Sequence, residues 1–443
     1  MRSAQAPLRY EKFGIEVFMM KKIKLFFVLI AMALAAPTFA AIDTIAVDVG
    51  ISVFQTMPIG VVPFEEEGTI KWPSEAPHLI LTRDANLSGR FEAVPSDKFD
   101  LVLFSKKRAR QYVTGNATKL SNGKIKLDCY LYAAETKDLL LGESYTVKPY
   151  DVRQAVHSFF DKVVYRLFGE RGIATTKLAY VSKIDGIKQV VISDYDGFSR
   201  RQITRDSSIN MMPVWQKGNK GLVYVNFRNQ RPNLYAISFG GKETPLFTQF
   251  KQTFSPAVNP KTGELLFSVT DGAKTEIYRG DMKTGSAQKF LHLKSNQVSP
   301  SWSPFASEVL FTSDRGGSPQ VYAVGKDGSD VRRITYMGHY NERASWSPEG
   351  DRIVYTSMDD GKMNIYTCAL DGTDIIQLTS NAGNNEHPTW SPDGKLIAFA
   401  SDRGGNYQIY IMRKDGSGVT RITNGAENTS PTWSWFFDEK KYK

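Results

Sequence analysis

The chain has 443 residues, of which 41% are hydrophobic, 12% aromatic and 23% charged, a composition that excludes an intrinsically disordered protein. This length exceeds the size at which a single hydrophobic core stops growing, so we expect two or more domains. The formal net charge is +10, but +4 of it lies in residues 1–40 and the other basic residues are scattered, so we expect no nucleic-acid partner.

The amino terminus has the pattern of a secretory signal peptide. Three lysines precede an uncharged apolar run over residues 25–36, which is too short for a membrane-spanning helix of about 20 residues. Pro37 and the small residues after it predict cleavage between Ala40 and Ala41. We interpret residues 1–40 as an upstream extension of 18 residues followed by a signal peptide, and we expect an exported, soluble mature chain. A retained amino-terminal anchor is the alternative.

Directly after the expected cleavage site, apolar residues alternate with small or polar ones, which is the pattern of a β-strand. A strand at a free chain end is mobile unless it is docked. Two interpretations stay open: a fixed edge strand, or a detachable strand over residues 41–53 that a partner protein captures by β-augmentation. The partner contacts of this segment would be its apolar residues: Ile42, Ile45, Val47, Val49, Ile51 and Val53.

Residues 41–170 contain no internal repeat, and their mixed periodicities predict a small α/β domain of the α+β type. Strands are predicted over residues 59–64, 99–104 and 111–118, and a hairpin over residues 124–132 and 139–147. One helix is predicted between a Ser74 cap and Gly89, and a second between an Asp151 cap and Leu167.

A repeat of about 44 residues fills the second half of the chain. Its markers are Trp302, Trp346, Trp390 and Trp433, which are 44, 44 and 43 residues apart. Trp215 lies two periods before the first of these, and Val258 occupies the register between them. Each unit contains four short apolar runs separated by Gly or Asp turns, which is typical of a β-propeller blade.

The two ends of the repeat complement each other. The first unit, which begins at Leu178, lacks the tryptophan strand, and the last unit, residues 431–435, consists of that strand alone. We therefore predict an all-β six-bladed propeller over residues 171–443, closed by the carboxy-terminal strand. The tryptophans are expected to pack between adjacent blades.

Motifs for catalysis or cofactor binding are missing from the sequence. It contains no Gly-x-Ser-x-Gly, phosphate loop or dinucleotide fingerprint, and its five histidines do not have metal-ligand spacing. Cys129 and Cys368 fall in different expected domains and are interpreted as buried thiols. We predict no catalytic residue, no metal and no cofactor. An exported propeller enzyme of the lactonase or glycan lyase type stays open as an alternative.

A polar, uncharged residue stands five positions before each tryptophan register: Asn210, Thr253, Gln297, Asn341, Asn385 and Asn428. In a propeller, these positions fall where the links between blades meet the strands nearest the axis. Two interpretations stay open: the side chains cap their own turns, or they form a hydrogen-bonding ring at the propeller mouth. Such a ring suits a protein or peptide ligand, and it would be varied by Glu342, Arg343, Glu386, His387 and Thr429.

The order of these features resembles the TolB family of the Tol-Pal envelope system. The resemblance covers nearly all of the mature chain and rests most on Ile59-Gly-Val-Val-Pro-Phe64, Leu87-Ser-Gly-Arg-Phe91, Gly169-Glu-Arg-Gly172 before Leu178-Ala-Tyr-Val181, and the Pro-x-Trp-Ser-Pro-Asp-Gly repeats. The departures from the family pattern are Val258 in place of an aromatic residue, Lys217 in place of a proline, and the first 18 residues.

The resemblance implies a monomeric, non-catalytic adaptor in the periplasm. It implies that the propeller mouth binds the peptidoglycan-associated lipoprotein Pal and that residues 42–53 bind the inner-membrane protein TolA, with other outer-membrane proteins as further partners. Through these contacts the protein would support outer-membrane integrity, cell division and protein transport. A propeller scaffold with different envelope partners is the remaining alternative.

Overall fold

The computed structural model describes residues 56–272, 274–359 and 361–437. The expected signal peptide, its cleavage site and the apolar residues of segment 41–53 lie outside this described part. The described residues belong to one compact unit, which begins at Ser52. Within them, every helix is too short or too polar to cross a membrane.

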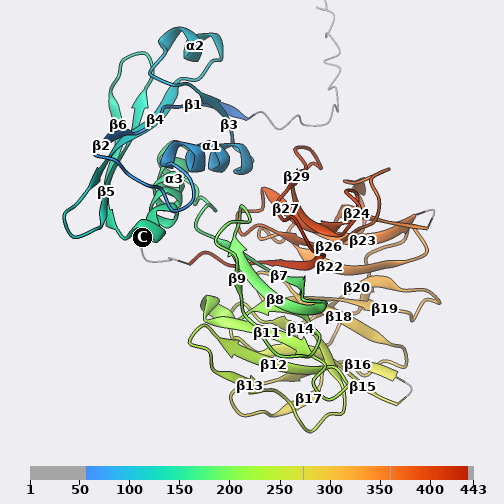
Figure 1. Ribbon diagram of the computed structural model, residues 1–443. Helices are drawn as coiled ribbons and strands as arrows, with labels where there is room; N and C mark the ends of the chain where they lie inside the picture. Colours follow the sequence, from blue (N-terminus) through green and yellow to red (C-terminus); the bar gives the residue numbers. More distant parts are fainter. Residues whose placement is uncertain (1–55, 273, 360, 438–443) are drawn as a thin grey trace, which may run out of the picture. The chain divides into compact units, whose positions relative to one another are not determined.

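The first half of the described chain forms a six-stranded sheet with three helices (Figure 1). The strand order is β3-β1-β4-β5-β6, and β2 pairs with β4 outside this path. β1 pairs in parallel with β3 and β4, whereas β4, β5 and β6 are antiparallel. The strands are β1 (Met57–Val61), β2 (Glu65–Glu67), β3 (Phe91–Pro95), β4 (Gln111–Lys119), β5 (Ile125–Ala133) and β6 (Leu139–Val147).

Two of the helices share a core with the sheet. The helices are α1 (Pro77–Leu87), α2 (Leu101–Lys106) and α3 (Val152–Phe168). Leu81 of α1 and Phe160 of α3 are buried with Leu127 of β5, and the Phe160 ring meets the Phe91 ring edge-on at 5.6 Å. Gly169 ends α3 in the left-handed conformation, with φ +69°, which glycine adopts without strain.

Three details of the predicted helices and strands are wrong. α1 begins at Pro77, so Ser74 does not cap it, and proline suits the first position because it has no N–H to satisfy. Residues 99–104, predicted as a strand, instead contain the cap and the first four residues of α2, where the Asp100 carboxylate accepts a hydrogen bond of 2.9 Å from a first-turn N–H. Asp151 precedes α3 but makes no side-chain capping bond.

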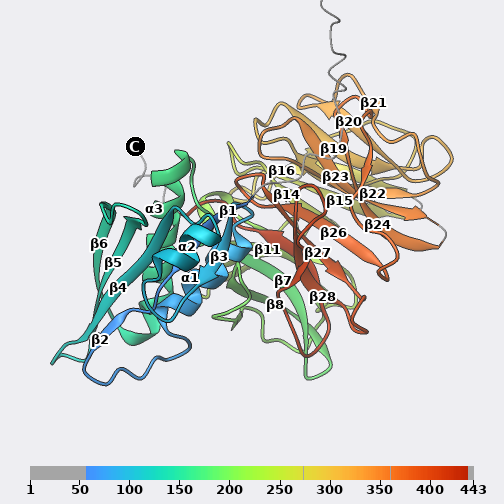
Figure 2. The ribbon, with the colours of Figure 1, turned by 90° about the horizontal axis from the view of Figure 1, so that it is seen from above.

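Residues 177–433 form six antiparallel four-stranded sheets, which confirms the predicted six-bladed propeller (Figures 1 and 2). Blade 1 contains β30 (Asn428–Trp433), β7 (Lys177–Ile184), β8 (Ile187–Asp194) and β9 (Arg201–Gln202). Blade 2 contains β10 (Asn210–Trp215), β11 (Gly221–Asn226), β12 (Asn233–Ser238) and β13 (Glu243–Pro245). Blade 3 contains β14 (Thr253–Val258), β15 (Leu265–Asp271), β16 (Lys274–Gly280) and β17 (Ala287–Lys289).

The remaining three blades repeat this arrangement. Blade 4 contains β18 (Gln297–Trp302), β19 (Glu308–Ser313), β20 (Gln320–Gly325) and β21 (Arg332–Arg333). Blade 5 contains β22 (Asn341–Trp346), β23 (Arg352–Asp359), β24 (Lys362–Ala369) and β25 (Ile376–Gln377). Blade 6 contains β26 (Asn385–Trp390), β27 (Leu396–Ser401), β28 (Gln408–Arg413) and β29 (Thr420–Arg421).

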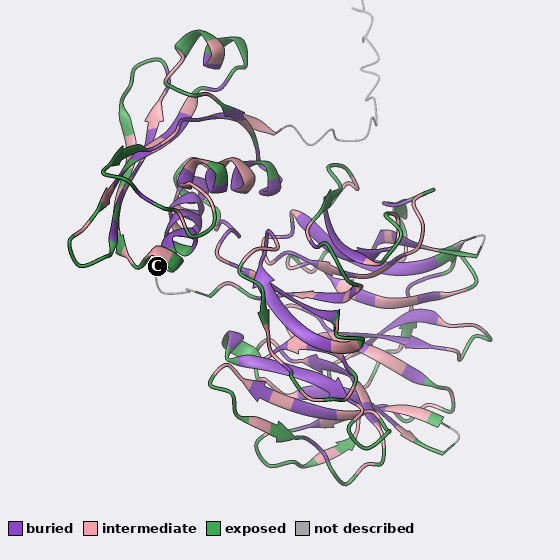
Figure 3. Cartoon of the chain, in the orientation of Figure 1, coloured by how far each residue is buried: buried purple, intermediate pink, exposed green. Residues whose placement is uncertain are grey.

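The repeat tryptophans pack between adjacent blades, as predicted. Trp302 of blade 4 shares a buried cluster with Leu266 and Ile277 of blade 3, and Trp390 of blade 6 shares one with Val354 of blade 5. Figure 3 shows this burial along the middle of the blade strands, with exposed residues gathered at the turns. Truncating a buried tryptophan to alanine costs about 3–5 kcal/mol, so these side chains contribute strongly to the ring.

Aromatic side chains compensate for the missing tryptophan at Val258. The junction of blades 2 and 3 buries Phe247 and Phe267, whose rings stack at a centroid distance of 4.3 Å. The Phe250 ring lies edge-on to Tyr278 at 4.8 Å in the same cluster. Phe247 and Phe250 thus add aromatic contacts to this junction, whereas Phe267 and Tyr278 pair as their equivalents in other blades do.

The carboxy-terminal strand closes the ring, as predicted. β30 pairs with β7, and Asn428 stands opposite Ser182 at one end of this pairing. At the other end, the Trp433 indole donates a hydrogen bond of 2.9 Å to the Thr176 hydroxyl. Blade 1 is therefore built from the two ends of the repeat region, and every blade has neighbours on both faces.

Asp161 of α3 fixes the linker that enters the propeller. Its carboxylate accepts hydrogen bonds from the backbone N–H groups of Ala174 (2.7 Å) and Thr175 (3.0 Å). Burial raises the pKa of Asp161 to about 6, although these hydrogen bonds oppose the shift. A Cβ at Gly172 would lie 2.3 Å from the carboxylate, so this close approach requires glycine.

Candidate binding site in the axial channel

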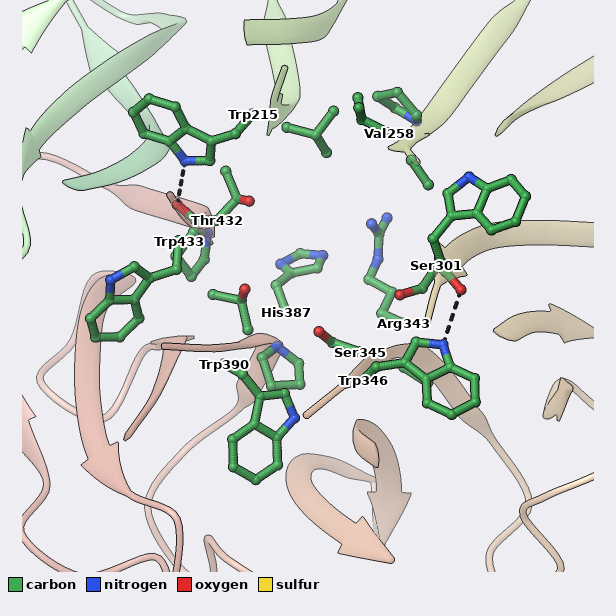
Figure 4. Close-up of a pocket in the computed structure, with 18 of the residues that line it drawn as sticks. Trp215, Val258, Ser301, Arg343, Ser345, Trp346, His387, Trp390, Thr432 and Trp433 are labelled. Carbon is green, nitrogen blue, oxygen red and sulfur yellow. Dashed lines mark hydrogen bonds between the residues drawn. The ribbon is translucent and has the colours of Figure 1, made fainter. Parts of the chain in front are cut away.

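The first strand of every blade sheet lines a channel on the propeller axis (Figure 4). These inner strands are β10, β14, β18, β22, β26 and β30, and together they enclose a cavity of ≈290 Å³. Prolines that follow the strands also line it: Pro260, Pro304, Pro348 and Pro392. The channel wall thus combines tryptophan, proline and small polar side chains.

Each inner strand contains a β-bulge at the same place, since its pairing register shifts between its second and fifth residues. The third residue of every inner strand is left-handed, with φ between +47° and +56°. We call these six residues the left-handed ring: Met212, Ser255, Ser299, Arg343, His387 and Ser430.

The left-handed ring is a functional-site candidate on backbone grounds. A non-glycine residue in this conformation costs about 1–2 kcal/mol, and bulges redirect side chains. All six residues line the cavity. Strained backbone conformations cluster at functional sites, and here they surround the cavity.

Two residues earlier, the first residue of every inner strand is fully buried. We call these six the buried polar ring: Asn210, Thr253, Gln297, Asn341, Asn385 and Asn428, each with 0% exposure. The expectation that they present hydrogen-bonding groups to a ligand at the mouth is therefore corrected. The alternative that they bond within the chain agrees with the structure.

The hydrogen bonds of Asn341 illustrate this internal role. Its amide donates to the Gln320 side chain of the preceding blade (2.9 Å) and to the Met337 carbonyl in the link between blades (2.7 Å). The same Gln320 oxygen accepts from the Thr335 hydroxyl (2.8 Å), which in turn accepts from a backbone N–H of β20. Asn341 therefore ties the link between blades 4 and 5 to blade 4.

The variable residues predicted beside the ring are partly exposed. Glu342 accepts a hydrogen bond of 2.9 Å from the Tyr340 hydroxyl, and Glu386 accepts one of 2.6 Å from Tyr407. Burial, reinforced by Glu342, raises the pKa of Tyr340 to about 12, so this hydroxyl stays a donor. Thr429 is also partly exposed, one position after Asn428 on β30.

Arg343 and His387 are the basic members of the left-handed ring. They lie on neighbouring blades 5 and 6, and both side chains point into the cavity in Figure 4. Burial, reinforced by the positive charges of Arg343 and Lys188, lowers the pKa of His387 well below its ordinary value. The imidazole is therefore neutral at pH 7, and the guanidinium carries the positive charge of this part of the wall.

A second cluster of titratable groups lies where α1 and α3 meet blade 1. Asp84, His157 and Asp196 are buried, and their ligand-type atoms lie within 4.8 Å of one another. Each has a protein partner: His157 Nδ1 lies 2.8 Å from Asp84, which also accepts from the Tyr195 hydroxyl, and Arg153 donates to Asp196. Although burial opposes it, Asp84 raises the pKa of His157. The cluster is an ion-pair network.

Exposed apolar side chains lie beside the end of the channel where the inner strands begin. Ile209, 45% exposed, directly precedes β10. Met337 is 68% exposed, and its carbonyl accepts the Asn341 hydrogen bond. Met358 is 38% exposed, and its N–H donates to the carbonyl of Tyr340.

Two members of the left-handed ring, Arg343 and His387, were predicted from the sequence, whereas the other four were not. Met212, Ser255, Ser299 and Ser430 share no residue type with Arg343 and His387, so no side-chain periodicity marks them. The available signal was positional, because a proline follows five of the six residues. The backbone conformation that unites them became visible only in the structure.

Comparisons with known proteins agree with this architecture. The sequence profile of the family described as TolB beta propeller domain matches residues 164–365 and 345–441. The chain is similar to the Tol-Pal system protein TolB of Methylobacillus flagellatus, with 27% identity over 244 residues, 52% of this chain and 56% of that protein. It is also similar to the protein of the same name from Desulfosudis oleivorans, with 29% identity over 39% of each chain.

The similarity to curated relatives is partial: the chain spans about half the length of those it matches, or less. The fold is similar to the crystal structure of TolB from Acinetobacter baumannii, with a TM-score of 0.74 and 24% identity, over 86% of this chain and 96% of that one. The family profile matches more than half of the chain, and the protein therefore belongs to the TolB β-propeller domain family.

Proposed function

We propose that this protein is a non-catalytic periplasmic adaptor of a Tol-Pal system. The observation that carries the proposal is a closed propeller of the TolB family whose axial cavity is ringed by strained, varied side chains. A cavity wall of this kind suits recognition of another protein. Its backbone has the same conformation in every blade, while its side chains differ from blade to blade.

The first partner proposed is the peptidoglycan-associated lipoprotein Pal, at the channel end where the inner strands begin. Exposed Ile209, Met337 and Met358 offer apolar contacts there. Partly exposed Glu342 and Glu386 offer acceptors whose positions are set by tyrosine hydroxyls. Apolar anchors beside positioned polar groups are the usual composition of a protein interface.

The second partner proposed is TolA, at segment 41–53. Support for this partner comes from the alternating apolar pattern of that segment and from the family to which the propeller belongs. If binding at the two sites is coupled, Pal must change the affinity for TolA by the factor by which TolA changes the affinity for Pal. The adaptor would thus connect the outer-membrane–peptidoglycan contact to an energised inner-membrane complex.

Calorimetry with the purified chain and the soluble domain of Pal from the same organism tests the proposal. We expect Met337→Asp to weaken Pal binding by roughly tenfold or more, because it places a charge in a desolvated contact. Phe305→Asp is the matched control: Phe305 is 63% exposed and follows the opposite end of β18.

Deleting residues 41–53 should abolish TolA binding. Failure of the unmodified chain to bind Pal would overturn the adaptor function.

A further inference from the structure

Arg343 and His387 differ from the rest of the left-handed ring in chemistry. The other four members are one methionine and three serines. Both basic residues have a positive φ, +51° and +56°, on adjacent inner strands. Figure 4 shows them converging toward the centre of the cavity, with Trp346 and Trp390 on the surrounding wall. The bulges thus place both residues on the cavity wall, where their side chains face the same space.

Neither donor has a strong partner among the described residues. The Arg343 guanidinium approaches Glu342 at 3.9 Å, beyond hydrogen-bond distance, and that carboxylate already accepts from Tyr340. His387 Nδ1 is shielded from solvent and has no hydrogen-bond partner; its distance to Glu386 is 4.0 Å. A shielded polar atom without a partner costs about 1–3 kcal/mol, whereas the exposed part of the His387 side chain, 21%, is what the cavity offers to a ligand.

We propose that Arg343 and His387 form a carboxylate-binding subsite, which receives an acidic side chain of the protein that docks on the propeller. This inference rests on the proposed adaptor function and specifies the chemistry of its partner. A guanidinium pairs with a carboxylate through two parallel hydrogen bonds, and the neutral imidazole supplies one further donor.

The size and lining of the cavity favour a single side chain as the occupant. A volume of ≈290 Å³ lies at the lower limit of small-molecule pockets and excludes a folded domain. Tryptophan and proline side chains, such as Trp346 and Pro348, provide apolar surface for the methylene groups of a glutamate. The partner would place the acidic residue in the channel while the rest of its surface contacts the rim.

The first experiment measures Pal affinity by calorimetry for the unmodified chain and for Arg343→Gln, Arg343→Lys and His387→Ala. We expect Arg343→Gln to weaken binding roughly 30-fold or more, because it removes the charge of a desolvated pair. Arg343→Lys should retain part of the affinity, and His387→Ala should have the smaller effect. Arg332→Gln is the control, since Arg332 lies on the outer strand β21, away from the channel.

The second experiment separates a partner side chain from a free carboxylate. Glutarate and uncharged glutaramide are titrated at constant ionic strength, and tryptophan fluorescence reports occupancy because Trp302, Trp346 and Trp390 line the cavity. We expect glutarate to change the fluorescence and to compete with Pal, glutaramide to do neither, and Arg343→Gln to abolish both effects.

Each remaining outcome has a defined meaning. Unchanged Pal affinity of Arg343→Gln together with glutarate binding would overturn the partner side chain in favour of a free carboxylate ligand. Absence of any glutarate effect together with unchanged affinity would overturn the subsite and leave the adaptor function standing. If the unmodified chain fails to bind Pal, the adaptor function fails, and specific glutarate binding would still support the carboxylate chemistry of the subsite.

Discussion

The buried polar ring and the left-handed ring lie two residues apart on the same six inner strands and have opposite relations to their surroundings. The first ring is fully buried, and its members bond within the chain, as Asn341 does with Gln320 of β20 and with Met337 of the link between blades. The second ring faces the cavity, and Arg343 and His387 within it lack strong protein partners.

The difference shows how a repeat separates structure from function. A position that meets the same environment in every blade keeps the same chemistry, as the mostly amide side chains of the buried polar ring do. A position that faces the shared cavity is free of that common environment, and its residues differ from blade to blade; under the proposed function, this variation matches a partner without sixfold symmetry. Uniform positions therefore indicate the scaffold, and varied positions with uniform backbone geometry indicate the binding site.

The largest expected effect on thermal stability comes from a deletion that removes one member of each ring. Deleting residues 428–443 removes β30, which pairs with β7 and whose Trp433 bonds to Thr176. We expect the cooperative thermal transition of the propeller to disappear, because blades 1 and 6 would each expose a packed face. Differential scanning calorimetry measures this, with deletion of residues 438–443 as the control that leaves β30 whole. An unchanged melting temperature would contradict closure by this strand.

A smaller expected effect, on the free energy of unfolding, distinguishes the buried polar ring from the left-handed ring. Asn341→Ala removes hydrogen bonds of 2.9 Å and 2.7 Å and leaves buried acceptors unpaired, so we expect a loss of about 1–3 kcal/mol in the free energy of unfolding. Arg343→Gln, two residues later, should change it by less than about 0.5 kcal/mol. Urea denaturation measures both variants. Equal losses would show that the left-handed ring is as structural as the buried one.

The smallest effect is a pH dependence carried by His387. Its pKa is lowered in the folded chain, so between that value and the unfolded value of about 6.5 the unfolded state binds a proton that the folded state does not. Stability contributed by the neutral imidazole is therefore lost as the pH falls below about 6.5. We expect the melting temperature to fall more between pH 7.5 and pH 5.5 for the unmodified chain than for His387→Gln. Parallel pH profiles would contradict this assignment.

The sequence predicted those elements whose key residues recur at a regular spacing. The tryptophan spacing predicted six blades and their closure, because each blade must bury the same apolar face. Local prediction failed at residues 99–104, where one capping bond from Asp100 selects a helix over a strand. The prediction of a Ser74 cap also failed, because α1 begins at Pro77 and its N-cap residue, Ala76, makes no side-chain hydrogen bond.

The candidate site was only partly predictable, because the burial of its residues depends on how the blades assemble. The sequence marked Asn341 and its five equivalents, but their polarity is equally consistent with a buried network and an exposed ring, and burial is a property of the assembled blades. Arg343 and His387 were recognisable in the sequence as basic residue types, whereas Met212 and the serines at equivalent positions were not.

The sequence by itself determined the number of blades, the strand that closes them and the family to which the propeller belongs, because these follow from short-range patterns repeated along the chain. Only the tertiary structure decided which polar residues face the axis. A bulge of one residue in each inner strand turns the third side chain into the channel and leaves the first one buried between blades. Such a choice depends on how each inner strand pairs with its neighbour and packs against the adjacent blade, which the residue types alone do not specify.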